Sequence, residues 1–201
     1  YCRSRPGEKW VGNDDVSAVR ISSDQGRTWS EVEVPDSVGC VHMNIEKMAD
    51  GSLLALFRSR WADAIYQSRS TDNGRTWTAP VASELPNNNS SIQFTRLANG
   101  HLAVVFNDVS AAQATERRAS LYDEIEDEEE GGALAAAEPE PTATGRTAFW
   151  GTPRAPMTLA ISEDGGRTWP YRRNLETGDG YCMTNNSELQ LNREYSYPSI
   201  R

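Results

Sequence analysis

Short hydrophobic segments recur along the whole chain, and turn-forming residues separate them. In some segments hydrophobic and polar positions alternate, as in VSAVRIS, and in others the hydrophobic residues run together, as in LLALF. Alternation over roughly 4–8 residues indicates a half-buried β-strand, and a short continuous run fits a strand that is buried on both faces. The pattern predicts strands over residues 16–22, 29–35, 40–48, 52–60, 65–70, 77–81, 90–97, 101–108 and 156–162, with the end of another strand near Tyr1.

One eight-residue phrase occurs three times: SSDQGRTW at 22–29, STDNGRTW at 70–77 and SEDGGRTW at 162–169. Its Asp can accept hydrogen bonds from the backbone of its own loop, while the glycine two positions later takes a positive φ. The Ser and Thr hydroxyls can cap further backbone groups, and the Trp offers a large apolar face for burial. The phrase therefore predicts a hairpin turn that is used repeatedly as part of one structural unit.

The spacing of the three copies indicates the size of that unit. The spacing between the first and second copies is about 40–50 residues, which is the length of one four-stranded unit. The spacing between the second and third copies is about twice as long. The longer interval fits two units or one unit with a long insertion. Residues 111–151 are rich in Ala, Glu, Pro, Gly and Thr, a composition that cannot bury enough apolar surface to fold by itself. We therefore predict one partial domain over 1–201, with an acidic low-complexity insertion at about 111–151.

Charge and cysteine usage exclude some classes of function. The 201-residue chain has a formal net charge of −9, and much of the acidity lies in the run DEIEDEEE at 123–130. Such a run argues against a nucleic-acid partner, because phosphates would repel it. The sequence contains no apolar stretch long enough to cross a membrane. The three cysteines lack metal-ligand spacing and allow one disulfide, although free thiols are favoured. We expect neither a metal nor a cofactor.

The repeated phrase closely resembles the Asp-box of the sialidase-like six-bladed β-propellers. The phrases NSSIQFTRLANGHLAVVFND, LAISEDGGRTW, GDGYCMTNNS and REYSYPSI resemble the BNR-repeat, predicted-neuraminidase group found in bacteria and plants. The resemblance covers nearly the whole chain outside the insertion. It implies an all-β, sialidase-like six-bladed propeller, of which this chain is a fragment of roughly three to four blades. It also implies that Asp24, Asp72 and Asp164 are structural and lie away from the active site.

The order of strands in a blade predicts which loops share the opposite face. The phrase joins the third strand to the fourth, so the loops between second and third strands, and the starts of the innermost strands, lie on the other side. A propeller binds ligands where its innermost strands converge around the central channel. The predicted site face therefore contains the loops after Tyr1, Phe57 and Phe106 and the strand starts near His42, Ser90 and Tyr195.

Sialidases bind the substrate carboxylate with three arginines, protonate the leaving group with an aspartic acid and use a tyrosine nucleophile paired with a glutamate. Arginine suits a carboxylate because its planar fork donates two parallel hydrogen bonds. A neutral phenol is not repelled by the carboxylate on the anomeric carbon, as a negatively charged nucleophile would be. On this resemblance the segment EYSYPSI makes Tyr195 the nucleophile, with Tyr197 as the alternative. The predicted acid is Asp14 or Asp15, with Asp63 as a further candidate.

The predicted substrate-binding residues are Arg58, Arg60, Arg154 and His42. Arg58 is the favoured carboxylate binder, while His42 also fits a buried, hydrogen-bonded structural role. One departure from the family pattern is that the chain contains no Arg-Ile-Pro motif, which sialidases usually carry in the first blade.

The implied function is an exo-acting glycoside hydrolase that releases a terminal acidic sugar from a glycan substrate. Two alternatives remain. One is a noncatalytic carbohydrate-binding propeller, and the other is a relative that acts on uronate- or rhamnose-containing polysaccharide, by elimination with His42 as the base.

Overall fold

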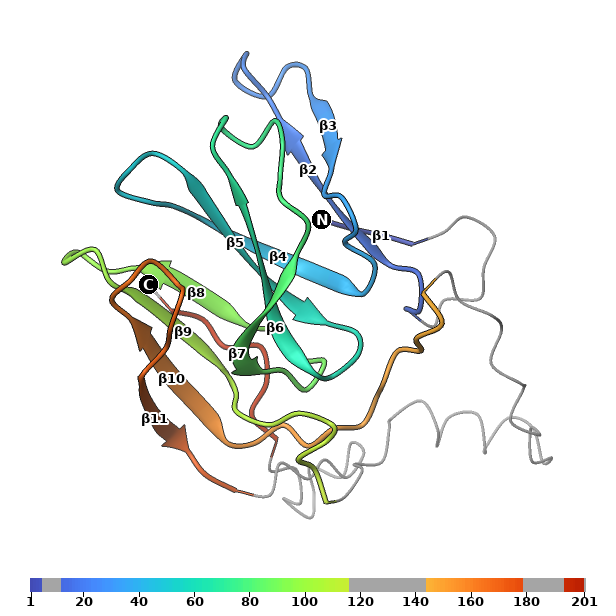
Figure 1. Cartoon of the computed structure of the whole chain (residues 1–201), viewed down its shortest axis with the longest axis vertical. Coiled ribbons are helices and arrows are strands. Elements are labelled where there is room, and N and C mark those ends of the chain that lie inside the picture. Colours follow the sequence, from blue (N-terminus) through green and yellow to red (C-terminus); the bar gives the residue numbers. More distant parts are fainter. Residues whose placement is uncertain (5–11, 116–143, 179–193, 201) are drawn as a thin grey trace.

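Every regular element in the described part of the structure is a β-strand. The structure is a computed structural model, and it describes residues 1–4, 12–115, 144–178 and 194–200. Its strands form three antiparallel sheets (Figure 1). They are β1 (Cys2–Arg3), β2 (Val16–Ile21), β3 (Ser30–Glu33), β4 (Cys40–Lys47), β5 (Leu53–Ser59), β6 (Ala64–Ser70), β7 (Val81–Pro86), β8 (Gln93–Arg96), β9 (Leu102–Asn107), β10 (Met157–Ser162) and β11 (Tyr171–Glu176). The all-β prediction is confirmed.

Each sheet follows the order of the chain. The second sheet has the order β4-β5-β6-β7, the third β8-β9-β10-β11 and the first β1-β2-β3. A four-stranded antiparallel sheet of this kind is one blade of a β-propeller. In the first sheet the repeated phrase joins β2 to β3, so its three strands correspond to the second, third and fourth strands of a blade. The connection between β9 and β10 contains the acidic region, and these two strands pair directly.

The fourth strand of the second blade lies later than predicted. The sequence pattern placed this strand at 77–81, but β7 spans Val81–Pro86. Thr78 does contact the neighbouring strand, because its carbonyl accepts a hydrogen bond from the Ser68 hydroxyl at 2.6 Å. Pro80 follows and has no N–H to donate to a ladder. The regular pairing with β6 therefore begins only after this proline.

The hydrophobic core lies between neighbouring blades. The second strand of each complete blade is buried nearly throughout, as the continuous runs in LLALF and LAVVF predict. One cluster joins the first and second blades and contains Val34, Cys40, Ala55, Phe57 and Trp77. A larger one joins the second and third and contains Leu54, Leu56, Ile65, Leu85, Ile92, Phe94, Leu102, Val104, Phe106, Ala160 and Trp169. Each blade is thus stabilised mainly by the apolar face of the next.

Each copy of the repeated phrase forms the same turn, which we call a Ser-x-Asp turn. In the first copy the Ser22 hydroxyl donates to Asp24 Oδ1 at 2.8 Å. Thr28 donates to the two oxygens of the same carboxylate, through its N–H at 2.9 Å and its hydroxyl at 2.6 Å. Gly26, at a φ of 84°, donates its N–H to Ser22 Oγ at 2.7 Å. The same contacts recur around Asp72 and Asp164. The predicted hairpin turn is therefore formed by bonds that are almost entirely local.

These hydrogen bonds stabilise the ionised form of all three carboxyl groups. The Thr28 hydroxyl and then the Thr28 N–H lower the pKa of Asp24 to about 2. Thr76 acts in the same way on Asp72, whose pKa is also lowered to about 2. Burial raises the pKa of Asp164, but hydrogen bonds from the backbone and hydroxyl of Thr168 outweigh it and hold that pKa below the ordinary range. Because their oxygens are occupied by their own loops, these carboxylates have a structural role in the turns.

The tryptophans that end the three turns differ in burial. Trp77 is 6% exposed and belongs to the cluster between the first and second blades, and Trp169 is 1% exposed in the cluster between the second and third. Trp29 is 60% exposed. Each buried tryptophan thus packs against the blade that precedes its own, and within the described residues Trp29 has no such blade beside it.

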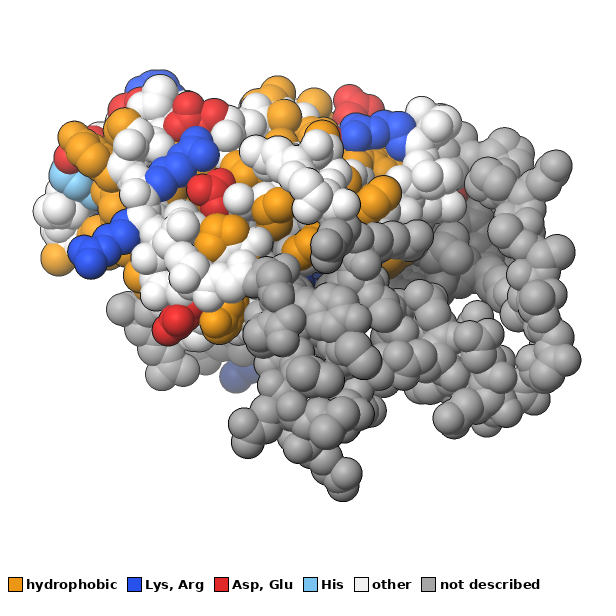
Figure 2. Space-filling view, turned by 90° about the horizontal axis from the view of Figure 1, so that it is seen from below, with side chains coloured by type: hydrophobic (Ala, Val, Ile, Leu, Met, Phe, Trp, Pro, Cys, Tyr) orange, Lys and Arg blue, Asp and Glu red, His pale blue; other side chains and the backbone are white. Residues whose placement is uncertain are grey.

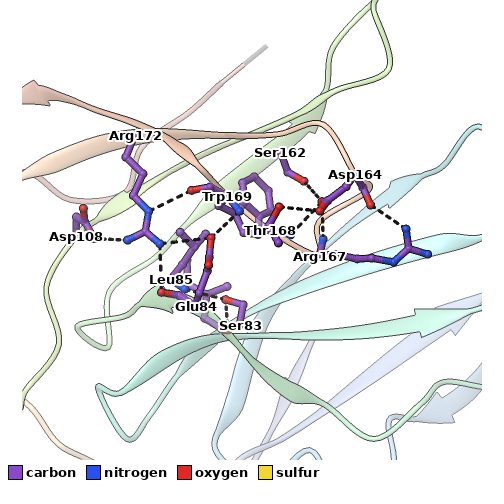
Figure 3. A network of polar contacts seen from close by, with 11 residues as sticks. Ser83, Glu84, Leu85, Asp108, Ser162, Asp164, Arg167, Thr168, Trp169 and Arg172 are labelled. Carbon is purple, nitrogen blue, oxygen red and sulfur yellow. Dashed lines mark hydrogen bonds and ion pairs between the residues drawn. The ribbon is translucent and has the colours of Figure 1, made fainter.

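A polar network also joins the second blade to the third turn (Figure 3). Glu84 on β7 accepts a hydrogen bond from the Trp169 N–H at 2.5 Å. Arg172 on β11 donates to the Glu84 carbonyl at 3.3 Å and lies 3.6 Å from both the Glu84 and Asp108 carboxylates. These side chains are partly exposed, so the ion pairs contribute little by themselves. Their main effect is to fix the third turn relative to β7.

The third turn and the first hairpin of the second blade share one face of the molecule. A cavity of about 280 Å³ lies between residues 48–52 of the hairpin and the turn residues Asp164, Gly165 and Arg167. Arg69 closes one side of it and donates to the Gly165 carbonyl at 2.6 Å. The loops that follow β5 and β9 start from the other end of these sheets. No helix in the described ranges is long and apolar enough to cross a membrane.

Candidate functional site

Arg58 lies near the end of β5 and Arg60 directly follows the strand, at the end away from the Ser-x-Asp turns. Residues two positions apart on a strand point to the same side, and both arginine side chains are held in the interior, at 3% and 4% exposure. Two buried guanidinium groups so close together repel each other, and burial of a charge is costly unless partners compensate for it. The way in which each arginine is compensated therefore defines the chemistry of the site.

Arg60 is neutralised by Asp15. The Arg60 Nε and Nη2 atoms lie 2.9 and 2.7 Å from Asp15 Oδ2. The other carboxylate oxygen of Asp15 accepts a hydrogen bond from the Ser4 hydroxyl at 2.6 Å. Asp15 is 1% exposed, so this is a buried ion pair that joins the first blade to the second. Asp14 precedes it in the same turn and is only half-buried.

Arg58 has only uncharged partners in the described part of the chain. Its Nε donates to Asn89 Oδ1 at 2.8 Å, and its Nη1 lies 3.4 Å from His42 Nδ1. Burial and the charge of Arg60 lower the pKa of Arg58 to about 10, while the nearby Tyr197 hydroxyl raises it. Arg58 therefore remains protonated at neutral pH and forms no ion pair with any described residue.

His42 reaches Arg58 because β4 is irregular at this point. The pairing of β4 with β5 shifts between Val41 and Asn44, and His42 has a φ of 50°. Burial, and then the charges of Arg58 and Arg60, lower the pKa of His42 to about 4. The imidazole is therefore neutral at neutral pH, and its Nδ1 can accept a hydrogen bond from Arg58.

The loop that precedes β8 holds Arg58 from the other side. Residues Asn87, Asn88, Asn89 and Ser90 are all buried. Asn89 has a φ of 56°, a conformation that asparagine adopts more readily than most residues. Its amide oxygen binds Arg58 and its amide nitrogen donates to the Phe149 carbonyl at 2.9 Å. Asn89 thus connects the buried arginine to the segment that follows the acidic region.

That segment crosses the site, and we call residues 146–150 the strap. Arg146 pairs with Asp63 at 2.8 Å and stacks on Trp61, with its Cζ 4.9 Å from the ring centroid. The Ala148 N–H donates to Asn13 Oδ1 at 2.7 Å, and the Phe149 N–H donates to the Arg60 carbonyl at 2.8 Å. Further hydrogen bonds come from Asn89, described above, and from Asn88, which donates to the Pro153 carbonyl at 2.8 Å just beyond the strap.

The strap places Trp150 over both arginines. The centroid of the Trp150 ring lies 5.1 Å from Arg60 Cζ and 5.7 Å from Arg58 Cζ, within the range of a cation–π interaction. The sequence offers no pattern that predicts this contact, because Trp150 lies at the end of the stretch assigned to the insertion.

The two candidate tyrosines lie in different surroundings. Tyr197 is 61% exposed, and its ring centroid lies 5.7 Å from Arg154 Cζ. The Tyr197 hydroxyl also raises the pKa of Arg58. Arg154 itself pairs with Glu194 at 3.0 Å. Tyr195 lies against the third blade, where it lines a cavity of about 540 Å³. Its hydroxyl donates to the Thr177 carbonyl at 3.2 Å.

The structure therefore brings most of the predicted site residues together. Arg58 contacts His42, Arg60 pairs with Asp15, and Trp150 lies over both arginines, while Arg154 lies over the ring of Tyr197. The Tyr195 hydroxyl is directed to Thr177 instead. Sequence reasoning missed Asn89 and Trp150. The run of three asparagines before a strand was a usable signal for a buried polar loop, whereas the position of Trp150 had none.

One face of the molecule carries charges of both signs (Figure 2). On the coloured part of the face in Figure 2, Lys and Arg side chains lie next to Asp and Glu, with hydrophobic side chains between them. Among the described residues, no group of three or more His, Cys, Asp and Glu side chains could hold a metal ion. Cys2 and Cys40 are free thiols, and Cys182 lies outside the described residues.

Residues 5–201 match the family model of the BNR repeat-like domain. The chain therefore belongs to the BNR repeat-like family, which agrees with the three repeated turns and the blade architecture. No curated protein matches the chain.

Solved structures with a similar fold include sialidases. The Hadza microbial sialidase Hz136 has a TM-score of 0.53 at 18% identity, over 82% of this chain and 26% of that one. The intramolecular trans-sialidase from Ruminococcus gnavus, in complex with oseltamivir carboxylate, has a TM-score of 0.51 at 17% identity, over 81% and 29%. A protein of unknown function from Dyadobacter fermentans has a TM-score of 0.50 at 16% identity, over 83% and 36%. The fold is thus that of part of a sialidase-like β-propeller, and the chain spans about a third or less of the length of these proteins.

Proposed function

We propose that the protein binds a terminal acidic sugar, sialic acid or a similar one, through the carboxylate and hydrolyses its glycosidic bond. The observation that carries this proposal is the state of Arg58. It is buried, protonated and surrounded by uncharged partners, so a ligand carboxylate would supply the counter-charge that the described residues do not. Arg60 differs, because Asp15 already neutralises it.

The geometry of Arg58 also limits how the ligand binds. Its Nε is used by Asn89 and one Nη1 proton is directed to His42. A carboxylate would therefore be bound end-on by Nη1 and Nη2, on the side of Arg58 where the Tyr197 hydroxyl acts on it. A charge-assisted bidentate contact of this kind is about twice as strong as a contact between neutral groups.

For the nucleophile, we propose a tyrosine of the segment 194–200. Tyr195 and Tyr197 are both candidates by sequence. The position of Tyr197 near Arg58 and Arg154 supports Tyr197, because a phenol beside two guanidinium groups would meet the anomeric carbon of a sugar bound through its carboxylate. The proton donor would be Asp14 or Asp15. The half-buried Asp14 is the more accessible of the two, since Asp15 is bound by Arg60 and Ser4.

A second candidate function rests on His42. Its lowered pKa keeps the imidazole neutral at neutral pH. The one lone pair of the neutral ring lies on Nδ1 and faces Arg58, so His42 would act as a base only once a bound carboxylate has replaced it as the partner of Arg58. A neutral base beside a bound carboxylate would suit elimination from a uronic acid, where the proton α to the carboxylate is removed.

Turnover of two substrates would test these proposals. The protein, expressed from its complete open reading frame, is assayed with a fluorogenic sialoside and with uronate oligosaccharides. We expect Arg58→Met to lower kcat/KM on the sialoside by at least about 100-fold, as loss of roughly 3 kcal/mol of charge-assisted binding implies. Arg20→Met, which changes an exposed arginine paired with Glu31, is the matched control. Full sialoside turnover by Arg58→Met would contradict the carboxylate site. Formation of unsaturated products from uronates, with no sialoside turnover, would favour elimination.

A further inference from the structure

The strap is held across the site by contacts to three parts of the molecule. It is bound to the first blade through Asn13, to the second through Asp63 and Arg60, and to the loop before the third through Asn89. Ordering each backbone residue costs about 1–2 kcal/mol, so anchors to three different parts of the molecule are needed to fix such a segment. Its single large aromatic side chain at the site, Trp150, then has a defined position.

We propose that Trp150 is a specificity-determining residue that forms an aromatic wall of the acidic-sugar site. This inference rests on the proposed function, because Arg58 is taken as the carboxylate binder. The Trp150 ring lies over the guanidinium groups of Arg58 and Arg60. A carboxylate bound to the free end of Arg58 therefore lies beside the indole, and the sugar ring attached to that carboxylate contacts it.

Two physical effects follow from this arrangement. The electron-rich face of the indole offsets part of the repulsion between the two arginines and keeps water from Arg58, which strengthens any anion contact. The indole also offers apolar surface to the C–H face of a pyranose ring, as aromatic side chains commonly do in ligand sites. The first effect serves every carboxylate, whereas the second serves only a carboxylate that carries a ring.

The test compares two ligands that differ in the ring. Binding of N-acetylneuraminic acid and of acetate is measured by NMR titration of the protein expressed from its complete open reading frame, for the wild type and for Trp150→Ala. We expect Trp150→Ala to weaken N-acetylneuraminic acid at least tenfold and acetate threefold or less. Trp150→Phe, which keeps an aromatic face, should recover most of the lost affinity for the sugar.

Controls separate this inference from the proposed function and from misfolding. Phe149→Ala changes the neighbouring side chain of the strap and should leave both affinities within about twofold, and circular dichroism melting checks the fold of each variant. If Trp150→Ala lowers the affinity for both ligands by the same factor, the proposed contact with the sugar ring would be overturned. Shielding of Arg58 from water would then account for the whole effect of Trp150. Failure of the wild type to bind N-acetylneuraminic acid, or unchanged binding in Arg58→Met, would instead overturn the proposed function.

Discussion

Removal of the tryptophan from a buried Ser-x-Asp turn should cost much more stability than the same change in the exposed turn. Trp169 is 1% exposed between the second and third blades. A buried aromatic side chain of this size removes about 150–250 Å² from water, which corresponds to about 4–6 kcal/mol at ~25 cal/mol per Å². Its Nε1 has no hydrogen-bond partner among the described residues. The loss on Trp169→Ala is therefore one of packing, about 3–5 kcal/mol after relaxation.

Trp29→Ala is the matched variant. Trp29 follows the same turn sequence but is 60% exposed, and its indole donates to the Gly26 carbonyl at 3.0 Å. The smaller buried area and one partly exposed hydrogen bond imply a loss of about 2 kcal/mol or less. Trp77→Ala, at 6% exposure, should behave like Trp169→Ala.

The assay is urea unfolding of the 201-residue chain, followed by far-ultraviolet circular dichroism because the variants change tryptophan fluorescence. The free energies of unfolding are compared at equal m-values. Similar losses in all three variants would refute the reasoning, because the tryptophan would then act within its own turn rather than between blades.

Two further predictions concern the surroundings of Arg58. Asn89→Asp is nearly isosteric and places a carboxylate 2.8 Å from the Arg58 Nε. This internal anion would neutralise Arg58, so we expect the affinity for N-acetylneuraminic acid to fall at least tenfold. Calorimetric titration with Asn88→Asp as the control tests this prediction, and an unchanged affinity in Asn89→Asp would refute it. His42 should titrate near pH 4 by NMR, and Arg58→Met should raise its pKa. Because the folded pKa is below the unfolded value of about 6.5, the unfolded chain takes up the proton first, so His42 lowers stability progressively as pH falls from about 6.5 to about 4. A His42 titration unaffected by Arg58→Met would show that the two side chains do not interact.

The turns and strands could be predicted because the interactions that define them are local. Asp24 is bound by residues no more than four positions away, and the same holds for Asp72 and Asp164. The one misplaced strand, β7, reflects a local exception, since Thr78 contacts the neighbouring strand before the proline and the regular ladder starts after it.

The candidate site was predictable only in part. The sequence placed Arg58, Arg60 and His42 on one face because the blade pattern predicts which residues lie at strand ends, and their role in binding stays a prediction. The positions of Asn89, which binds Arg58, and of Trp150, which lies over both arginines, depend on contacts between residues far apart in the chain. One such contact joins Asn89 to Phe149. The side-chain directions of Tyr195 and Tyr197 likewise depend on Thr177 and Arg154, which no periodicity encodes.

The pairing of β9 with β10 does not depend on the segment that connects the two strands along the chain. Six residue pairs, from Leu102–Ser162 to Asn107–Met157, join these strands directly, although the covalent path between them runs through the long acidic region. A polypeptide of residues 1–115 would keep β1–β9, and one of residues 144–201 would bring β10, β11 and the strap. We expect the two polypeptides to associate through the β9–β10 pairing and the contacts of the strap. The connection between β9 and β10 is therefore a suitable point at which to split the protein into two complementing fragments. Their association would bring Trp150 back over Arg58 and Arg60.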